Sequence, residues 1–333
     1  MSAILQSGAF LIIILAGFLL KKGNLVGARD YKVLQTIIFD LTLPAAIVYS
    51  FATNPHEMNL LLIALFGLAC ATVPIVVLFF VSRRRKVSQR AFLMLNGSGF
   101  NVGTFCFPVL QVFLGPSSLV VASMFDMGNA VMVTAGLNVM TSSLLRIDME
   151  RTLAEQYQGD APVVPRPKLR DRDARRIAVR EKVKAIALAF LKSPSFDIYL
   201  IMILVMVFNL AIPGWIATVL QPVSQANPFI SMLMVGMLME LPQTKADVKA
   251  VLEVIGWRIP LAILFAVAAW YLLPFDGVAR KAIVMVCFAP TAIFSTLFTE
   301  KVLGSPKLAG FTLAATAILA IIAMTVVNII VPV

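Results

Sequence analysis

Long apolar runs separated by short polar or charged segments dominate the sequence. The run Leu61–Val81 contains no charged residue, and about 18 or more consecutive apolar residues are typical of a membrane-spanning helix. These runs are continuous, so they do not fit a transmembrane β-barrel, whose strands alternate apolar and polar residues. The pattern predicts an all-α integral membrane protein with ten transmembrane helices, at Ala3–Leu20, Val33–Phe51, Leu60–Val81, Ala91–Leu114, Ser117–Leu145, Ser195–Leu210, Pro228–Leu241, Ile259–Leu273, Ala282–Glu300 and Leu308–Val331.

The segment Ile212–Ala226, between the sixth and seventh predicted helices, is largely apolar but contains Pro213, Gly214 and Pro222. Proline interrupts a helix because it lacks an N–H and its ring clashes with the preceding turn. We expect this segment either to extend the sixth helix or to form a re-entrant turn.

One long polar segment, residues 146–192, divides the chain and holds 12 basic and 7 acidic residues among its 47. It separates residues 1–145 from residues 193–333, and each part is predicted to contain five helices. An odd number of helices gives the two parts opposite orientations, which is the arrangement of an inverted repeat and a common transporter design. The sequence thus predicts two inverted five-helix repeats joined by a charged linker.

Composition supports a membrane protein, because 60% of the residues are hydrophobic and only 14% are charged, whereas soluble domains are about a quarter charged. If the linker is cytoplasmic, 26 of the 28 Lys and Arg residues lie on that side of the membrane. Basic residues in short loops mark the cytoplasmic side. We therefore expect a multi-pass protein of the cell membrane with both termini outside the cytoplasm. The net charge of +11 is explained by this bias, and no nucleic-acid partner is expected.

The residue types needed for metal binding or catalysis are sparse. Cys70, Cys106 and Cys287 all fall inside predicted helices without a CxxC spacing, and His56 is the only histidine. Buried free cysteines usually behave as small apolar residues. The sequence also lacks an HExxH motif and a Ser/His set. We expect no metal, no cofactor and no enzymatic activity.

Two predicted helices carry helix-breaking residues at corresponding places in the two halves. The fourth contains three glycines and two asparagines before Pro108, and the ninth contains Pro290. Backbone groups freed by such breaks must face protein or a wet cavity, and matched interruptions in two halves indicate a transporter's binding site. We expect Pro108 and Pro290 to break their helices at the same membrane depth. The candidate substrate-binding residues are Asn101, Gly103, Pro108, Pro290 and Thr291.

The chemistry of these stretches suits an anion. Half-helix N-termini present free N–H groups and a partial positive charge, and the amide of Asn101 can donate to a carboxylate. No Lys or Arg is expected within the crossing itself, so recognition should depend on amides and helix dipoles.

Two acids lie deep in apolar stretches, Asp40 and Asp126. Intramembrane acids usually face an interior cavity and mark proton or ion pathways. We take Asp126, with the nearby Asn129, as the candidate for ion coupling. Asp40 is expected to have a structural role, paired with Lys32 or Lys21.

Several short motifs, in this order and spacing, resemble the auxin efflux carrier family, which includes plant PIN-type auxin exporters and bacterial malate or malonate permease-like proteins. The resemblance covers nearly all of both helical halves. The residues that carry it are Asn101, Gly103 and Pro108 in the fourth helix, Phe113–Pro116 with Phe125–Asn129, Leu43–Ala46, Lys192–Pro194, and Ala289–Pro290 with Phe298–Lys301.

This resemblance implies that the fourth and ninth helices cross near mid-membrane. It also implies a scaffold of helices 1, 2, 6 and 7, a transport domain of helices 3–5 and 8–10, a homodimer, and an elevator-like motion that carries an organic anion, with H⁺ or Na⁺ as the coupling ion. Cys106 stands where the family usually has glycine, and Ser193 and Ser195 stand where plant carriers have asparagines. Auxin is therefore not the expected substrate. Two alternatives remain open: a sodium-coupled symporter resembling bile-acid transporters, and a non-transporting membrane receptor on the same fold.

Overall fold

A computed structural model of the protein describes residues 2–27, 29–55, 57–159, 161–163 and 194–332, together with six single residues between 173 and 184. Most of the predicted linker at 146–192 lies outside these described residues, as do Lys192 and Ser193 of the family-like motifs.

The first half of the chain is a succession of helices, three of which include π-helical segments. Its elements are α1 (Ser2–Lys22), α2 (Tyr31–Ile37), the π segment η1 (Ile38–Thr42), α3 (Leu43–Thr53), the one-turn η2 (Met58–Leu60), α4 (Leu61–Val81), α5 (Val87–Gly97), the π segment η3 (Val102–Cys106), α6 (Phe107–Leu114), α7 (Ser117–Val131), the π segment η4 (Met132–Gly136) and α8 (Leu137–Leu145).

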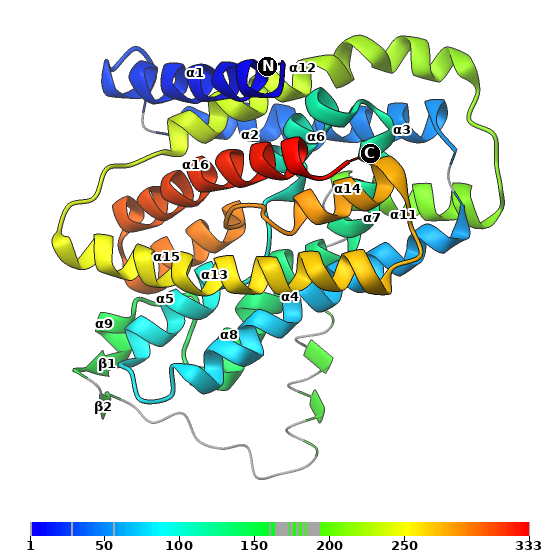
Figure 1. Cartoon of the computed structure of the whole chain (residues 1–333). Helices are drawn as coiled ribbons and strands as arrows, with labels where there is room; N and C mark the ends of the chain where they lie inside the picture. Colours follow the sequence, from blue (N-terminus) through cyan, green and yellow to red (C-terminus); the bar gives the residue numbers. More distant parts are fainter. Residues whose placement is uncertain are drawn as a thin grey trace.

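A short helix and a two-stranded antiparallel sheet follow, and from residue 194 onward the described chain forms six further helices (Figure 1). These elements are α9 (Leu153–Gln156), β1 (Tyr157–Gln158), β2 (Ala161–Pro162), α11 (Pro194–Val207), α12 (Gly214–Leu238), α13 (Lys245–Leu272), α14 (Gly277–Val286), α15 (Ile293–Leu303) and α16 (Pro306–Ile330).

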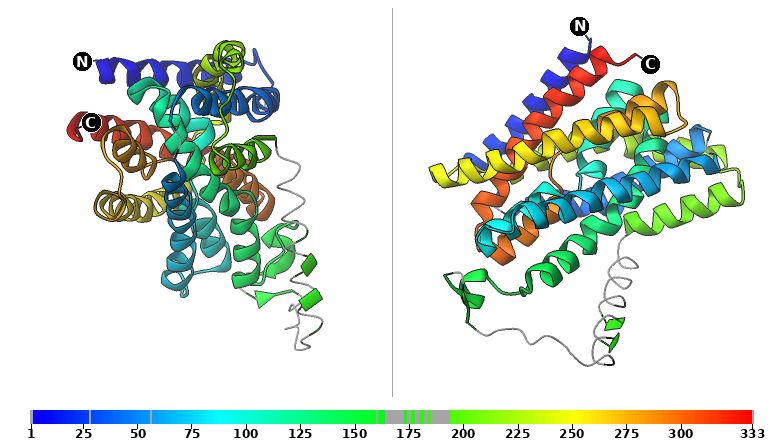
Figure 2. Two further views of the ribbon diagram at one scale, coloured as in Figure 1. Left: turned by 90° about the vertical axis from the view of Figure 1, so that its right-hand side faces the viewer. Right: turned by 60° about the horizontal axis from the view of Figure 1, so that its bottom comes forward.

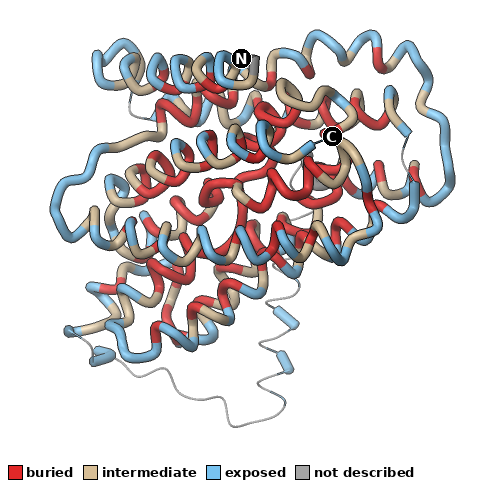
Figure 3. The backbone as a smooth tube through the Cα atoms, viewed as in Figure 1, coloured by how far each residue is buried: buried red, intermediate tan, exposed pale blue. Residues whose placement is uncertain are grey.

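The helices confirm an all-α membrane protein. Among the described residues, six helical stretches are long and apolar enough to cross a membrane, and a seventh is formed if α5 and the helix Val102–Leu114 count as one bent span. Many large apolar side chains are exposed on these helices, such as Leu5 and Phe80. The residues coloured as exposed lie on the outside of the bundle (Figure 3). Lipid can cover such a surface. The count of ten helices and the inverted repeat stay predictions.

Two helices begin earlier than the hydrophobic pattern predicts. The segment Ile212–Ala226 neither extends the sixth helix nor forms a re-entrant turn, because most of it forms the first half of α12. Pro213 occupies the N-cap of α12. The missing N–H of a proline costs little there, because the N–H groups at the start of a helix have no partner within the helix. The next helix, α13, begins at Lys245 rather than Ile259 because Thr244 and Asp247 form a capping box, which stabilises a helix start in polar sequence.

Glycines allow two pairs of helices to pack closely. A Cβ atom at Gly128 of α7 would lie 1.8 Å from the Ala64 carbonyl oxygen of α4, and one at Gly67 would lie 2.2 Å from the Phe125 carbonyl oxygen. Gly236 of α12 approaches α1 in the same way, and Figure 1 shows α1 alongside α12. Small residues are typical of helix interfaces in membranes because they let backbones approach.

The two ends of the chain also come together. The end of α16 lies beside the start of α1 (Figure 2), where the hydroxyl groups of Ser7 and Thr325 are 2.6 Å apart. This contact joins the first and last helices of the bundle.

The close approach of α4 and α7 predicts a sharp difference between two glycine substitutions. Gly128→Ala should destabilise the protein by about 1–3 kcal/mol, the usual cost of overpacking, because the new Cβ would overlap the α4 backbone. Gly256→Ala on α13 is the matched control, since nothing lies within 4 Å of its Cβ position. Alanine there should be neutral or stabilise by about 0.5–1 kcal/mol. Melting temperatures of the purified variants test this, and equal values would contradict the described packing.

Candidate functional site

Two helix interruptions meet in the interior. The first spans residues 98–101, between α5 and η3, and the second spans residues 287–292, between α14 and α15. The Asn101 N–H donates to the Pro290 carbonyl at 3.0 Å, and the Thr291 hydroxyl donates to the Asn96 carbonyl at 3.1 Å. These bonds join the two interrupted helices at the contact that the sequence predicts as a crossing.

The sequence predicted that the first interruption would lie at Pro108, but the interruption lies before Val102. Gly99 adopts a positive φ of 71° within the interruption, a conformation that glycine adopts without steric cost. The helix from Val102 to Leu114 then runs through Pro108, which occupies the first turn of α6. The π segment η3 ends two residues before Pro108, and local π adjustments are one way in which membrane helices accommodate a proline without ending. Pro290, in contrast, lies inside the second interruption.

Arg258 of α13 binds the carbonyl groups that the interruptions expose. Its Nη1 donates to the Asn96 carbonyl at 3.1 Å and to the Gly99 carbonyl at 2.9 Å, and its Nη2 donates to the Ala289 carbonyl at 2.8 Å. The guanidinium also lies 5.3 Å from the centre of the Phe100 ring. A cation is favourable here because helix C-termini carry a partial negative charge.

The expectation that no basic residue lies at the crossing is therefore wrong. It failed because Arg258 was assigned to a polar segment before a helix predicted to start at Ile259. Because α13 begins at Lys245, Arg258 lies in the middle of that helix. It therefore no longer belongs to the 26 Lys and Arg residues that were predicted on the cytoplasmic side.

The helical segments that follow the two interruptions are η3 and α15. Their N-terminal ends line a cavity of about 250 Å³. The first turn of η3 and the start of α15 both contribute to its wall. The residues that line the cavity are Phe39, Asp40, Leu43, Phe100, Asn101, Val102, Gly103, Thr104, Asp126, Asn129, Ala130, Val133, Thr134, Tyr199, Ala292, Ile293 and Phe294. First-turn N–H groups have no helical partner and attract negative charge.

Asn101 presents an unpaired donor at this cavity. Its Oδ1 accepts a hydrogen bond from the Thr104 hydroxyl, whereas its Nδ2 has no partner among the described residues although the side chain is buried. A buried donor without an acceptor costs about 1–3 kcal/mol. A ligand acceptor in the cavity would remove that cost.

Asp126, Asn129 and Tyr199 form a connected polar group on another wall. Asn129 donates from Nδ2 to Asp126 Oδ1 at 2.9 Å and also pairs with both backbone groups of Phe100. The Tyr199 hydroxyl donates to Asp126 Oδ2 at 2.7 Å. Each carboxylate oxygen of Asp126 therefore accepts a hydrogen bond, and the second bond joins α7 to α11.

Gly103 brings the N-terminus of η3 close to that carboxylate. A Cβ atom at Gly103 would lie 3.3 Å from Asp126 Oδ2 and 2.9 Å from Leu43 Cδ2. A larger residue would therefore push the helix terminus away from both neighbours.

The cavity thus includes four of the seven predicted site residues: Asn101, Gly103, Asp126 and Asn129. Pro108, Pro290 and Thr291 do not line it, although Pro290 and Thr291 bond the interruptions to each other.

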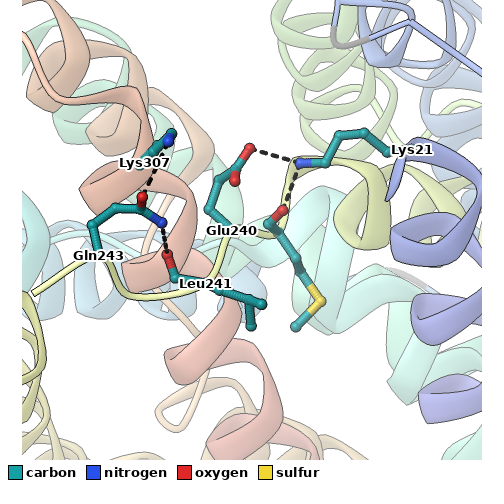
Figure 4. Close-up of polar contacts among 6 residues, drawn as sticks. Lys21, Glu240, Leu241, Gln243 and Lys307 are labelled. Atoms are coloured by element: carbon teal, nitrogen blue, oxygen red, sulfur yellow. Dashed lines mark hydrogen bonds and ion pairs between the residues drawn. The ribbon is translucent and has the colours of Figure 1, made fainter. Parts of the chain in front are cut away.

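Asp40 also lines the cavity, and its expected pairing with Lys32 or Lys21 is wrong, because it forms an ion pair with neither residue. Lys21 donates instead to Glu240, at 2.9 Å, and to the Met239 carbonyl (Figure 4). Asp40 lies in the π segment η1, and π segments inside helices are frequent at functional sites.

Two residues of the site were missed by the sequence interpretation. Arg258 carried a recognisable signal, a lone arginine beside an apolar run, which is unusual enough in membrane helices to suggest a function. Tyr199 carried none, because its role depends on a contact with Asp126, 73 residues away in the chain.

A larger and more charged cavity of about 530 Å³ adjoins the site, since both include Ile293. Lys21, Glu240 and Lys307 lie along its wall. Figure 4 shows the Lys21–Glu240 ion pair and the bond from Lys307 to Gln243 across the loop that follows α12.

Among the described residues, no group of three or more His, Cys, Asp or Glu side chains is arranged to hold a metal ion. None of the curated proteins matches the sequence. The membrane transport protein family does match it, over residues 7–328. Because that match covers nearly the whole chain, and the family is the one that the sequence motifs resemble, the chain belongs to the membrane transport protein family, the auxin efflux carrier family of membrane transporters.

Proposed function

We propose that the protein is a secondary-active or facilitative transporter of small organic anions, chiefly carboxylates, and that it works by elevator-type alternating access. One observation carries the proposal: the N-termini of η3 and α15 and the unpaired Nδ2 of Asn101 converge on one cavity. Such N–H groups bind carboxylates and phosphates in many proteins.

The cavity volume supports a small substrate. About 250 Å³ corresponds to roughly eight water molecules at ~30 Å³ each. That space suits a metabolite of about that many non-hydrogen atoms and is below the range of drug-sized ligand pockets.

The helix contacts support the proposed division into scaffold and transport domain, within two inverted repeats at 1–145 and 193–333. We define the scaffold as α1, α2–α3, α11 and α12, and the transport domain as α4–α8 and α13–α16. Within the scaffold, α12 packs against α1 and α3, and α11 packs against α3. Within the transport domain, α4 packs against α7, and α15 packs against α16.

The cavity lies between these two proposed parts. Phe39, Asp40 and Tyr199 come from the scaffold, whereas Asn101, Asp126 and Ile293 come from the transport domain. A substrate bound there would touch both parts, which is the position required if one part carries it past the other.

Arg258 supports coupling to protons rather than to sodium at the crossing. Its guanidinium already binds carbonyl groups from both interruptions, and such carbonyls are the groups that coordinate Na⁺ in transporters with broken helices. We therefore favour the organic-anion carrier over the sodium-coupled symporter, with Asp126 as the proton-carrying group and a homodimer in the cell membrane as the expected assembly.

Asn101→Ala should weaken carboxylate binding. A hydrogen bond to a charged partner is worth about 1.5–3 kcal/mol, so affinity should fall roughly tenfold to a hundredfold. Asn96→Ala is the matched control, because the Asn96 amide already donates to Thr299 and to the Phe92 carbonyl. That variant should lose thermal stability and keep its affinity. Affinity and melting temperature measured on the same samples distinguish the two, and unchanged affinity in Asn101→Ala would exclude its substrate role.

Asp126→Asn should abolish accumulation driven by a pH gradient and leave substrate binding detectable. The amide keeps the shape of the side chain but cannot take up a proton. Tyr199→Phe is the control, since it removes the bond to Oδ2 and keeps the acid. Transport into vesicles with an imposed pH gradient measures both variants. Normal pH dependence in Asp126→Asn would eliminate Asp126 as the coupling acid.

The basic-residue bias predicts that the linker is cytoplasmic. A cysteine introduced at the exposed Gln158 should resist an impermeant thiol reagent in intact cells, whereas one at the exposed Glu57 should react. The three native cysteines are buried and should give little background. The reverse labelling pattern would invert the orientation.

A further inference from the structure

The cavity at the crossing carries negative charge as well as helix N-termini. Asp40 and Asp126 both line it, and none of the described residues around it is Lys, Arg or His. Two half-helix N-termini supply only about half a positive charge each. A simple carboxylate would therefore enter a cavity that already holds two acidic side chains.

Among the described residues, no Lys, Arg or His forms an ion pair with Asp40 or Asp126. Arg258 is bound to carbonyl groups of the interruptions, and Lys21 is paired with Glu240. The two hydrogen bonds to Asp126 come from neutral groups, the Asn129 amide and the Tyr199 hydroxyl. Asp40 is an exposed residue that lines the cavity, and it has no hydrogen bond or ion pair with a described residue.

The positive and negative parts of the cavity are adjacent. Gly103, in the first turn of η3, lies so near Asp126 that a Cβ on it would be 3.3 Å from Oδ2. Leu43, three residues after Asp40, approaches the same glycine. A ligand with a carboxylate and an ammonium group on neighbouring atoms would match both parts, whereas widely separated charges would not.

Most of the remaining wall is apolar, apart from Thr104 and Thr134. The rings of Phe39 and Phe294 lie 6.3 Å apart, and Val133 and Ile293 adjoin the same space. An apolar substituent would pack there and displace water.

We propose that the substrate of this cavity is an α-amino acid with a small apolar side chain. Its carboxylate would accept from Asn101 Nδ2 and the N-terminus of η3, and its ammonium group would face Asp40 and Asp126. The inference rests on the proposed function and narrows its substrate class to carboxylates that also carry a cation.

Three ligands that share the isobutyl group of leucine test this: leucine, 4-methylpentanoate, which lacks the ammonium group, and 3-methylbutylamine, which lacks the carboxylate. Binding to the purified full-length protein is measured by titration calorimetry in sodium-free buffer and again with sodium. Leucine should bind at least tenfold more tightly than either analogue in both buffers.

The variant Asp40→Asn should weaken leucine binding at least tenfold and leave 4-methylpentanoate unchanged or tighter. Glu57→Gln, an exposed acid outside the cavity, should leave all three affinities unchanged. Melting temperatures without ligand check that both variants fold.

The inference is overturned if 4-methylpentanoate binds as tightly as leucine, or if Asp40→Asn leaves leucine affinity unchanged. It is also overturned if sodium alone restores tight 4-methylpentanoate binding, because the acids would then hold a coupling ion. Binding only of other mono- or dicarboxylates overturns the inference and leaves the proposed function intact. Failure of every carboxylate to bind or be transported contradicts both.

Discussion

The whole arrangement depends on satisfying the backbone groups that two interrupted helices leave unpaired inside an apolar bundle. No water is present in the hydrocarbon region to bond them, so each must find a partner in the protein or in a wet cavity. Arg258 alone binds three of the carbonyl groups at the two breaks. Side chains also accept from the N–H groups of Phe100 and Thr291, but among the described residues no side chain accepts from the first-turn N–H groups of η3 or α15. That asymmetry leaves the N-terminal ends of η3 and α15 free to bind a ligand.

The interruptions could be predicted from the sequence because their cause is local. Three glycines and two asparagines within an otherwise apolar run have no reason to occur in a continuous lipid-facing helix, and Asn101, Gly103, Asp126 and Asn129 do reach the cavity. The position of the first break was predicted wrongly. Proline seemed the strongest helix breaker in the stretch, yet the π segment η3 just before Pro108 lets the helix continue through it, as local π adjustments do in membrane helices.

The residues that could not be predicted owe their roles to contacts distant in sequence or to a helix boundary. Tyr199 matters only because the fold brings α11 against α7, where its hydroxyl meets Asp126. Arg258 was assigned to a loop because the apolar run begins after it, whereas the helix begins at the Thr244–Asp247 capping box. Hydrophobicity identifies the part of a helix that meets lipid, but capping and side-chain hydrogen bonds decide where the helix begins.

The polar group formed by Asp126, Asn129 and Tyr199 connects ligand binding to the proposed motion. Close glycine contacts join α4 to α7 and α1 to α12, and a third, at Gly310, brings α16 against the end of α12. The bond from Tyr199 to Asp126 joins α11 of the proposed scaffold to α7 of the proposed transport domain at the wall of the cavity. Under the proposed motion, one part would move past the other and this bond would have to break or re-form. A proton on Asp126, or a cationic group beside it, would change that bond directly, which would link the occupancy of the cavity to the proposed movement.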